Sequence, residues 1–214
     1  RKGDARPAAV RALVLYPMNA LVEDQIARLR KALDGDEIRE LLDNEDILNG
    51  NRIYFGSYNG DTIAKKNHEL LENWAGNDIE KRRTFDRKRE EVAKELSKIH
   101  DEYERILATE NKPEDALYIS PRLGGKCGTT AEMVTRWDMQ NWSPDIMITN
   151  TSMLSIMLMR KAESPIFEQT KRWLAAEDIA DESEREKVKK HRIFHIVVDE
   201  LHLYRGTAGS EVAC

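Results

Sequence analysis

Short apolar runs alternate with helical periodicity along most of the chain. Helical spacing of apolar residues covers residues 19–35 and 36–42, and it returns at residues 153–158. Four short apolar runs have the composition of strands buried on both faces of a sheet: residues 12–16, 52–55, 145–149 and 194–198. Strands separated by helices predict an α/β fold with a parallel sheet and helices on both faces.

The middle of the chain breaks this rhythm, because residues 77–112 contain neither Gly nor Pro. Apolar residues recur there with heptad spacing, at Phe85, Val92, Leu96, Ile99, Tyr103 and Ile106. The pattern predicts a long amphipathic helix, one arm of a hairpin whose other arm lies around residues 68–74. We interpret its basic start as a solvated helix face, with nucleic-acid contact as the alternative, at Arg82, Arg83, Arg87, Lys88 and Arg89.

Composition narrows the class of protein. Charged residues make up 34% of the 214 residues and hydrophobic residues 40%, which indicates exposed helix around one core. The net charge of −5 gives no overall basic field, although a local basic groove is compatible with it. The two cysteines, Cys127 and Cys214, form no disulfide framework, and we find no signal peptide or membrane span. We therefore expect a cytoplasmic protein, of which this chain, starting at Arg1, is a piece.

Two adjacent carboxylates, Asp199 and Glu200, directly follow the fourth apolar run. Open α/β sheets bind their ligands beyond the carboxyl ends of the strands. Neighbouring carboxylates repel each other unless they share a cation or a proton. The pair therefore predicts a Mg²⁺–nucleotide site, with one carboxylate near the metal and the other polarising water. The alternative is a strand that ends at the surface in solvated acids.

Two other kinds of site, a phosphate-binding loop and a zinc site, fit the sequence poorly. Residues 124–130 (GGKCGTT) resemble a phosphate-binding loop, but Ser120 replaces its opening Gly, and Cys127 stands where Ser or Thr should bind the metal. We therefore interpret the segment as a flexible turn. Zinc binding at His191, His195, Asp199 and His202 is rejected, because a strand sends neighbouring side chains to alternate faces.

The ends of the other three predicted strands carry small polar groups. They are residues 16–19, 56–62 and 149–152, which should lie along one edge of the sheet. Hydroxyl, amide and helix N-terminal groups bind a sugar–phosphate backbone without reading its sequence. Each segment alone fits an ordinary cap or turn. Together with the Asp-Glu pair they indicate a nucleic-acid track.

These segments together resemble the superfamily-two DEAD/DEAH-box (DExH) helicases, in particular a large prokaryotic branch with members linked to DNA repair or phage defence. Their order is that of motifs Ia, Ib and II, and the resemblance extends from residue 12 to residue 213 except for residues 64–130. The matching segments are residues 15–25 (motif Ia), 59–62 (a Gly-Asp-Thr segment), 136–139 and 144–154 (motif Ib and its approach), 198–202 (motif II, DELH) and 204–213.

The resemblance implies ATP and Mg²⁺ as cofactors and assigns roles to individual residues. Asp199 and Glu200 would bind Mg²⁺–ATP, Glu200 would orient the attacking water, and His202 would link the nucleotide to the nucleic acid. Nucleic acid, with DNA favoured over RNA, would contact Pro17, Asn19, Gly60, Asp61, Thr62, Arg136, Thr149, Asn150 and Ser152.

The resemblance also implies how the chain is organised. Residues 1–63 and 131–214 would form part of the first RecA-like domain, and residues 64–130 a helical insertion. The phosphate loop is expected before residue 1 and the second RecA-like domain after residue 214, so this piece alone should not hydrolyse ATP. The alternative is a non-catalytic scaffold whose insertion binds a protein partner, although the intact Asp199–Glu200 pair argues against such decay.

Overall fold

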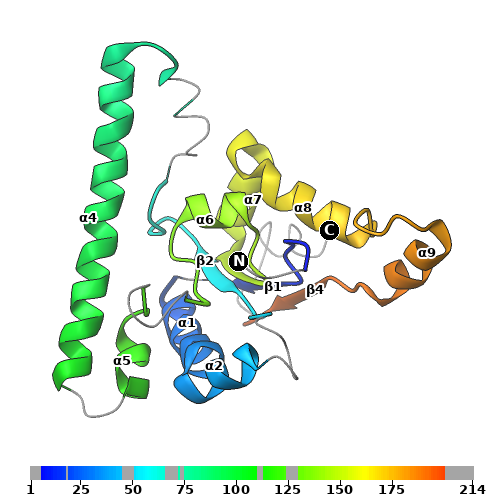
Figure 1. The fold of residues 1–214 in the computed structure, drawn as a ribbon, viewed down its shortest axis with the longest axis horizontal. Coiled ribbons are helices and arrows are strands. Elements are labelled where there is room, and N and C mark those ends of the chain that lie inside the picture. The colour runs from blue at the N-terminus through cyan, green and yellow to red at the C-terminus, as the bar shows by residue number, and fades with distance from the viewer. Residues whose placement is uncertain are drawn as a thin grey trace.

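One parallel sheet organises the chain. The computed structural model describes residues 6–17, 19–44, 51–65, 72, 75–109, 113–123 and 130–200. Within these ranges the strands pair in the order β2-β3-β1-β4, all parallel, and helices lie on both faces of the sheet (Figure 1). This is the predicted α/β class, in the form expected for part of a RecA-like fold. The strands are β1 (Ala12–Tyr16), β2 (Phe55–Tyr58), β3 (Ile146–Asn150) and β4 (His195–Val198).

The first core lies on one face of the sheet. Alternate residues of a strand point to opposite faces, so Leu13 and Leu15 of β1 reach this core together with Met147 of β3. The helices that cover it contribute Met139, Met157 and Ile166. They are α6 (Arg136–Asn141), α7 (Thr151–Met159) and α8 (Ser164–Leu174), with a 3₁₀ turn, η1 (Lys161–Glu163), before α8.

The second core lies on the other face, under α1 (Asn19–Asp34). Val22 and Ile26 of this helix are fully buried against Tyr16, Ile148 and Phe55. Helix α2 (Asp36–Asp43) follows directly, after Gly35. Helix α9 (Glu182–His191) precedes β4 and buries none of its residues. Each face of the sheet thus has its own apolar layer, which fixes the strands relative to one another.

The insertion contains α4 (Ile79–Thr109) and α5 (Pro113–Ile119). The expected long helix is present, and only the two ends of its heptad seam are fully buried. Near its start Phe85 packs against Ala75 and Trp137. Near its end Tyr103 and Ile106 pack against α5, which itself lies on α1. The middle of the seam, at Val92, Leu96 and Ile99, is half-buried.

Ion pairs attach the C-terminal end of the insertion to the core. Arg122 donates to the Asp36 carboxylate at 2.6 Å and to the Tyr103 hydroxyl at 3.1 Å. On the return segment the Glu132 carboxylate accepts two hydrogen bonds from the Arg30 guanidinium, and both side chains are buried. A bidentate pair has strict geometry, so the Arg30–Glu132 contact fixes where the insertion rejoins the sheet.

The observed strand β2 differs from the expected one. Strand β2 begins at Phe55, three residues later than predicted, and it includes Gly56, which the sequence suggested as a strand end. A Cβ at Gly56 would lie 2.7 Å from the Met133 carbonyl oxygen, so a close backbone approach requires glycine inside the strand. Apart from Glu72, the expected second hairpin arm at residues 68–74 lies outside the described residues. No helix in the described ranges is long and apolar enough to cross a membrane.

We expect Leu117→Ala to destabilise the protein by about 2–5 kcal/mol, because Leu117 is only 1% exposed where α5 joins α4. Urea unfolding measures this change in the free energy of unfolding. The matched control is Leu158→Ala on α7, where the side chain is 66% exposed and the expected change is within about 0.5 kcal/mol. Equal effects of the two substitutions would contradict the role of α5 as the anchor of the insertion.

Candidate functional site

The carboxyl ends of the four strands lie in one row. In the register of the sheet Tyr58 pairs with Thr149, Tyr16 pairs with Asn150, and Leu15 pairs with Val198. The segments that follow the strands therefore share one edge, as the sequence predicted. Neighbouring strands are about 4.8 Å apart, so the ends of β2 and β4 are separated by roughly 14 Å along this edge.

The Asp199–Glu200 pair lies at the β4 end of the row. The Asp199 amide donates to the Leu15 carbonyl at 3.0 Å, which continues the ladder one residue beyond β4. The Asp199 carboxylate accepts the Glu200 amide at 2.8 Å. Glu200 has a φ of 50°, a left-handed conformation that is uncommon for residues other than glycine. The chain thus turns sharply at Glu200, and both half-buried carboxylates stay at the strand end.

Tyr16, at the end of β1, interacts with this pair. Its hydroxyl hydrogen-bonds to the Asp199 carboxylate, and burial followed by the Asp199 charge raises the pKa of Tyr16. Sequence reasoning did not identify Tyr16 as a site residue. The parallel pairing of β1 with β4 is what brings the two side chains together, and neither segment alone carries a signal for it.

The opposite end of the row is the loop Asn59–Thr62, which is held by its own side chains. The Asn59 amide oxygen accepts the amides of Asp61 at 2.8 Å and Thr62 at 3.1 Å. The Thr62 hydroxyl donates to the Ser57 carbonyl at 2.8 Å and accepts the Asn59 amide at 2.9 Å. Because Asn59 and Thr62 are buried, only Gly60 and Asp61 are exposed at the tip.

Arg136 contacts this loop from its buried side. Its guanidinium donates to the Asn59 carbonyl and stacks over the Tyr58 ring, 5.0 Å from the ring centroid. The side chain is only 3% exposed, and burial lowers the pKa of its guanidinium. The structure thus places Arg136 beneath the surface that was expected to meet phosphate. Its position is that of a support for the loop.

A buried polar chain continues from Tyr58. The Tyr58 hydroxyl donates to Glu163 and accepts from Gln140, both at 2.9 Å. Burial, together with the Glu163 carboxylate, raises the pKa of Tyr58. Arg160, more exposed than the others, lies 3.5 Å from the Glu163 carboxylate. This chain connects β2, α6 and η1, so the loop Asn59–Thr62 rests on three elements at once.

The strand ends between the two extremes are partly buried. Thr149 is fully buried, and its hydroxyl donates to the Tyr58 carbonyl, which ties β3 to β2. The Asn150 side chain caps α7 by accepting the Met153 amide at 2.7 Å. Ser152 is exposed in the first turn of α7, and Pro17 is half-buried after β1. Asn19 begins α1 at the same edge.

The exposed and half-buried groups of this edge could bind ligands directly. Within the described ranges no three His, Cys, Asp or Glu side chains are grouped as a metal site. Mg²⁺ is usually bound by one or two carboxylates plus substrate phosphates, and Asp199 with Glu200 fits that donor set. His202 and residues 124–129 of the glycine-rich segment lie outside the described residues.

Comparisons with known proteins give one informative match. The chain is 32% identical, over an alignment of 221 positions, to the Druantia protein DruE of Escherichia coli (strain UMEA 4076-1). The alignment covers 95% of this chain and 11% of that protein, so the chain spans about one ninth of its length. No family model matches the chain, and no solved structure matches it.

We expect Asp199→Asn to lower the pKa of Tyr16 toward the ordinary value for tyrosine. The substitution removes the charge and the carboxylate hydrogen bond that raise this pKa, while burial continues to raise it. The ultraviolet absorbance of tyrosinate, followed as the pH is raised, measures the change, and a Tyr16→Phe variant identifies the signal of Tyr16. A Tyr16 titration that is unchanged in Asp199→Asn would contradict the contact between the two side chains.

Proposed function

We propose that this chain is part of the first RecA-like domain of an ATP-dependent DExH helicase or translocase. The observation that carries the proposal is the position of Asp199 and Glu200 at the carboxyl end of β4, in one row with the three polar strand ends. The order of helicase-like motifs along residues 12–213 supports it independently of this geometry.

At the β4 end of the row the two carboxylates would have different roles. Asp199, oriented by the Tyr16 hydroxyl and the Glu200 amide, would be the carboxylate that holds Mg²⁺. Glu200 would orient the water that attacks the γ-phosphate of ATP. Bound Mg²⁺ would neutralise charge on the phosphates. A complete site also needs a phosphate loop, which this chain does not carry in recognisable form.

Along the rest of the row a nucleic-acid strand would meet Gly60, Asp61 and Ser152, which are exposed, and Pro17 at the end of β1. Thr62, Arg136 and Thr149 are buried and would act by holding the loop and the strand ends in place. Such contacts are made to the sugar–phosphate backbone, so binding should be independent of base sequence and should weaken with salt.

We expect Glu200→Gln, made in the full-length protein, to abolish steady-state ATP hydrolysis while leaving ATP binding intact. The amide keeps the size of the side chain and loses the charge that would orient the water. Phosphate release measures hydrolysis, and a fluorescent ATP analogue measures binding. Glu168→Gln, an exposed position on α8, is the control and should behave as wild type. Retained hydrolysis in Glu200→Gln would remove Glu200 from this role.

We also expect Thr62→Val to weaken single-strand binding to a similar extent for unrelated sequences, because the loop loses the hydroxyl that joins Ser57 to Asn59. Thr62→Ser keeps that hydroxyl and should bind nearly as wild type. Fluorescence anisotropy with labelled oligonucleotides of several sequences measures the affinity. If Thr62→Val bound as tightly as Thr62→Ser, the loop geometry would not matter for nucleic acid.

A further inference from the structure

Helix α4 has an uneven distribution of charge. Its first eleven residues, 79–89, contain six basic side chains and two acidic ones. The remaining residues, 90–109, contain six acidic side chains and three basic ones. The first third therefore carries a net charge of +4 and the rest −3, with His100 neutral. The six bases are Lys81, Arg82, Arg83, Arg87, Lys88 and Arg89.

This distribution is the reverse of what stabilises a helix. The N-terminus of a helix has partial positive charge, so acidic side chains are favourable there and basic ones at the C-terminus. In α4 only Glu80 is acidic in the first turn, and the last turn has no basic residue. The helix dipole thus does not explain the basic cluster, although Lys81, Arg82 and Arg87 each have a partner in the chain. A polyanionic ligand would explain it, as an alternative to the solvated face that the sequence favoured.

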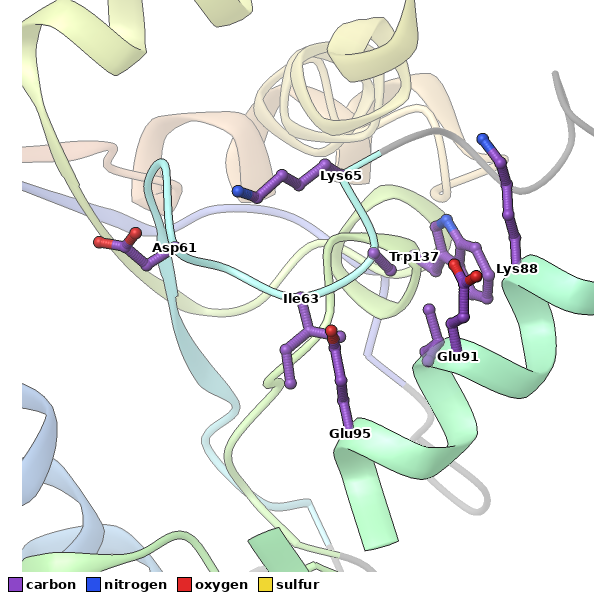
Figure 2. A pocket seen from close by; sticks show the side chains of 9 residues that line it. Asp61, Ile63, Lys65, Lys88, Glu91, Glu95 and Trp137 are labelled. Atoms are coloured by element: carbon purple, nitrogen blue, oxygen red, sulfur yellow. The ribbon is translucent and has the colours of Figure 1, made fainter. Parts of the chain in front are cut away.

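One wall of a cleft next to the loop Asn59–Thr62 is α4 where its basic part meets its acidic part, with Lys88 from the first and Glu91, Val92 and Glu95 from the second (Figure 2). The cleft has a volume of about 400 Å³, within the usual range for ligand sites. The opposite wall is the segment that leaves the loop, and the indole of Trp137 on α6 lies beside Glu91 and Lys88. The lining residues are Asp61, Ile63, Ala64, Lys65, Lys88, Glu91, Val92, Glu95 and Trp137.

These groups match the parts of a nucleotide. An indole offers a surface on which any base can stack. The carboxylates of Glu91 and Glu95 can accept hydrogen bonds from exocyclic amines of a base. Lys65 and Lys88 lie at the cleft, and the exposed Arg83 and Arg87 extend the positive charge along the helix toward phosphates.

We propose that the first three turns of α4, with Lys65 and Trp137, form a second nucleic-acid contact, in which the strand passing the tip of the loop Asn59–Thr62 places one base in the cleft and its phosphates along the basic cluster. This rests on the proposed function, since the strand is the one that the sheet edge would bind. It gives the insertion a role of its own, which is to extend the track beyond the sheet.

The test compares two triple variants of the full-length protein that each remove three positive charges from α4. Arg83→Ala/Arg87→Ala/Lys88→Ala alters the basic cluster, and Lys94→Ala/Lys98→Ala/Arg105→Ala is the matched control on the acidic part of the same helix. Binding of a single-stranded oligonucleotide is measured at several salt concentrations. We expect the first variant to flatten the slope of log K against log salt by about 2, at roughly 0.7 per lost phosphate contact, and the control to keep the wild-type slope.

A second measurement addresses the cleft. Oligonucleotide binding should quench tryptophan fluorescence, and the quenching should be smaller in Trp137→Phe, which keeps the packing against Phe85. Wild-type binding with equal slopes in both triple variants, or equal quenching in Trp137→Phe, would overturn this inference and leave the proposed function standing. Absence of nucleic-acid binding by the wild-type protein would overturn both.

Discussion

The hydrogen-bonded register of β1 with its two neighbours determines where the strand ends and the two cores lie. Because β1 pairs with β3 on one side and β4 on the other, Tyr16 stands level with Asn150 and next to Asp199. A shift of one residue would exchange the two cores and move the strand ends out of line, since side chains alternate between faces. The row of polar strand ends, and with it the candidate site, follows from this register.

Buried polar contacts hold the loop after β2, which lies outside the strand pairing. Arg136, Tyr58, Glu163 and Gln140 form a chain under the loop after β2. Buried charges are costly to desolvate and add little to stability, but a connected set with strict geometry admits few alternative arrangements. Its contribution is therefore to the shape of the loop. A loop that is already ordered loses less conformational entropy when it binds a backbone.

The apolar patterns predicted the strands and the helices α1, α2, α4 and α7, whereas α6, α8 and α9 were not predicted. Strand β1 was predicted with its observed bounds, because its apolar run is continuous until Pro17 ends it. The predicted strand ended at Phe55 because Gly56 follows it. In the structure Gly56 lies inside β2, where the close approach of Met133 requires a glycine. Helix α9 buries nothing and so has no periodicity, although Asp181, which caps it by accepting the Glu184 amide, was a readable start signal. The polar residue types at the strand ends could be read from the sequence. The burial of Thr149 and Arg136 could not, because it depends on packing against segments that are distant in the sequence.

The two ends of the site edge differ in how completely the described chain surrounds them, and this difference matters for their proposed roles. The loop after β2 rests on three elements and faces α4 across a cleft. Asp199 and Glu200 follow β4, an edge strand whose Ile196 and Val197 are 60% and 49% exposed. An edge strand with exposed apolar side chains is stabilised when further structure covers its edge and its apolar surface. A preformed loop fits the proposed contact with a nucleic-acid backbone, and an open carboxylate pair fits the proposed Mg²⁺–nucleotide site.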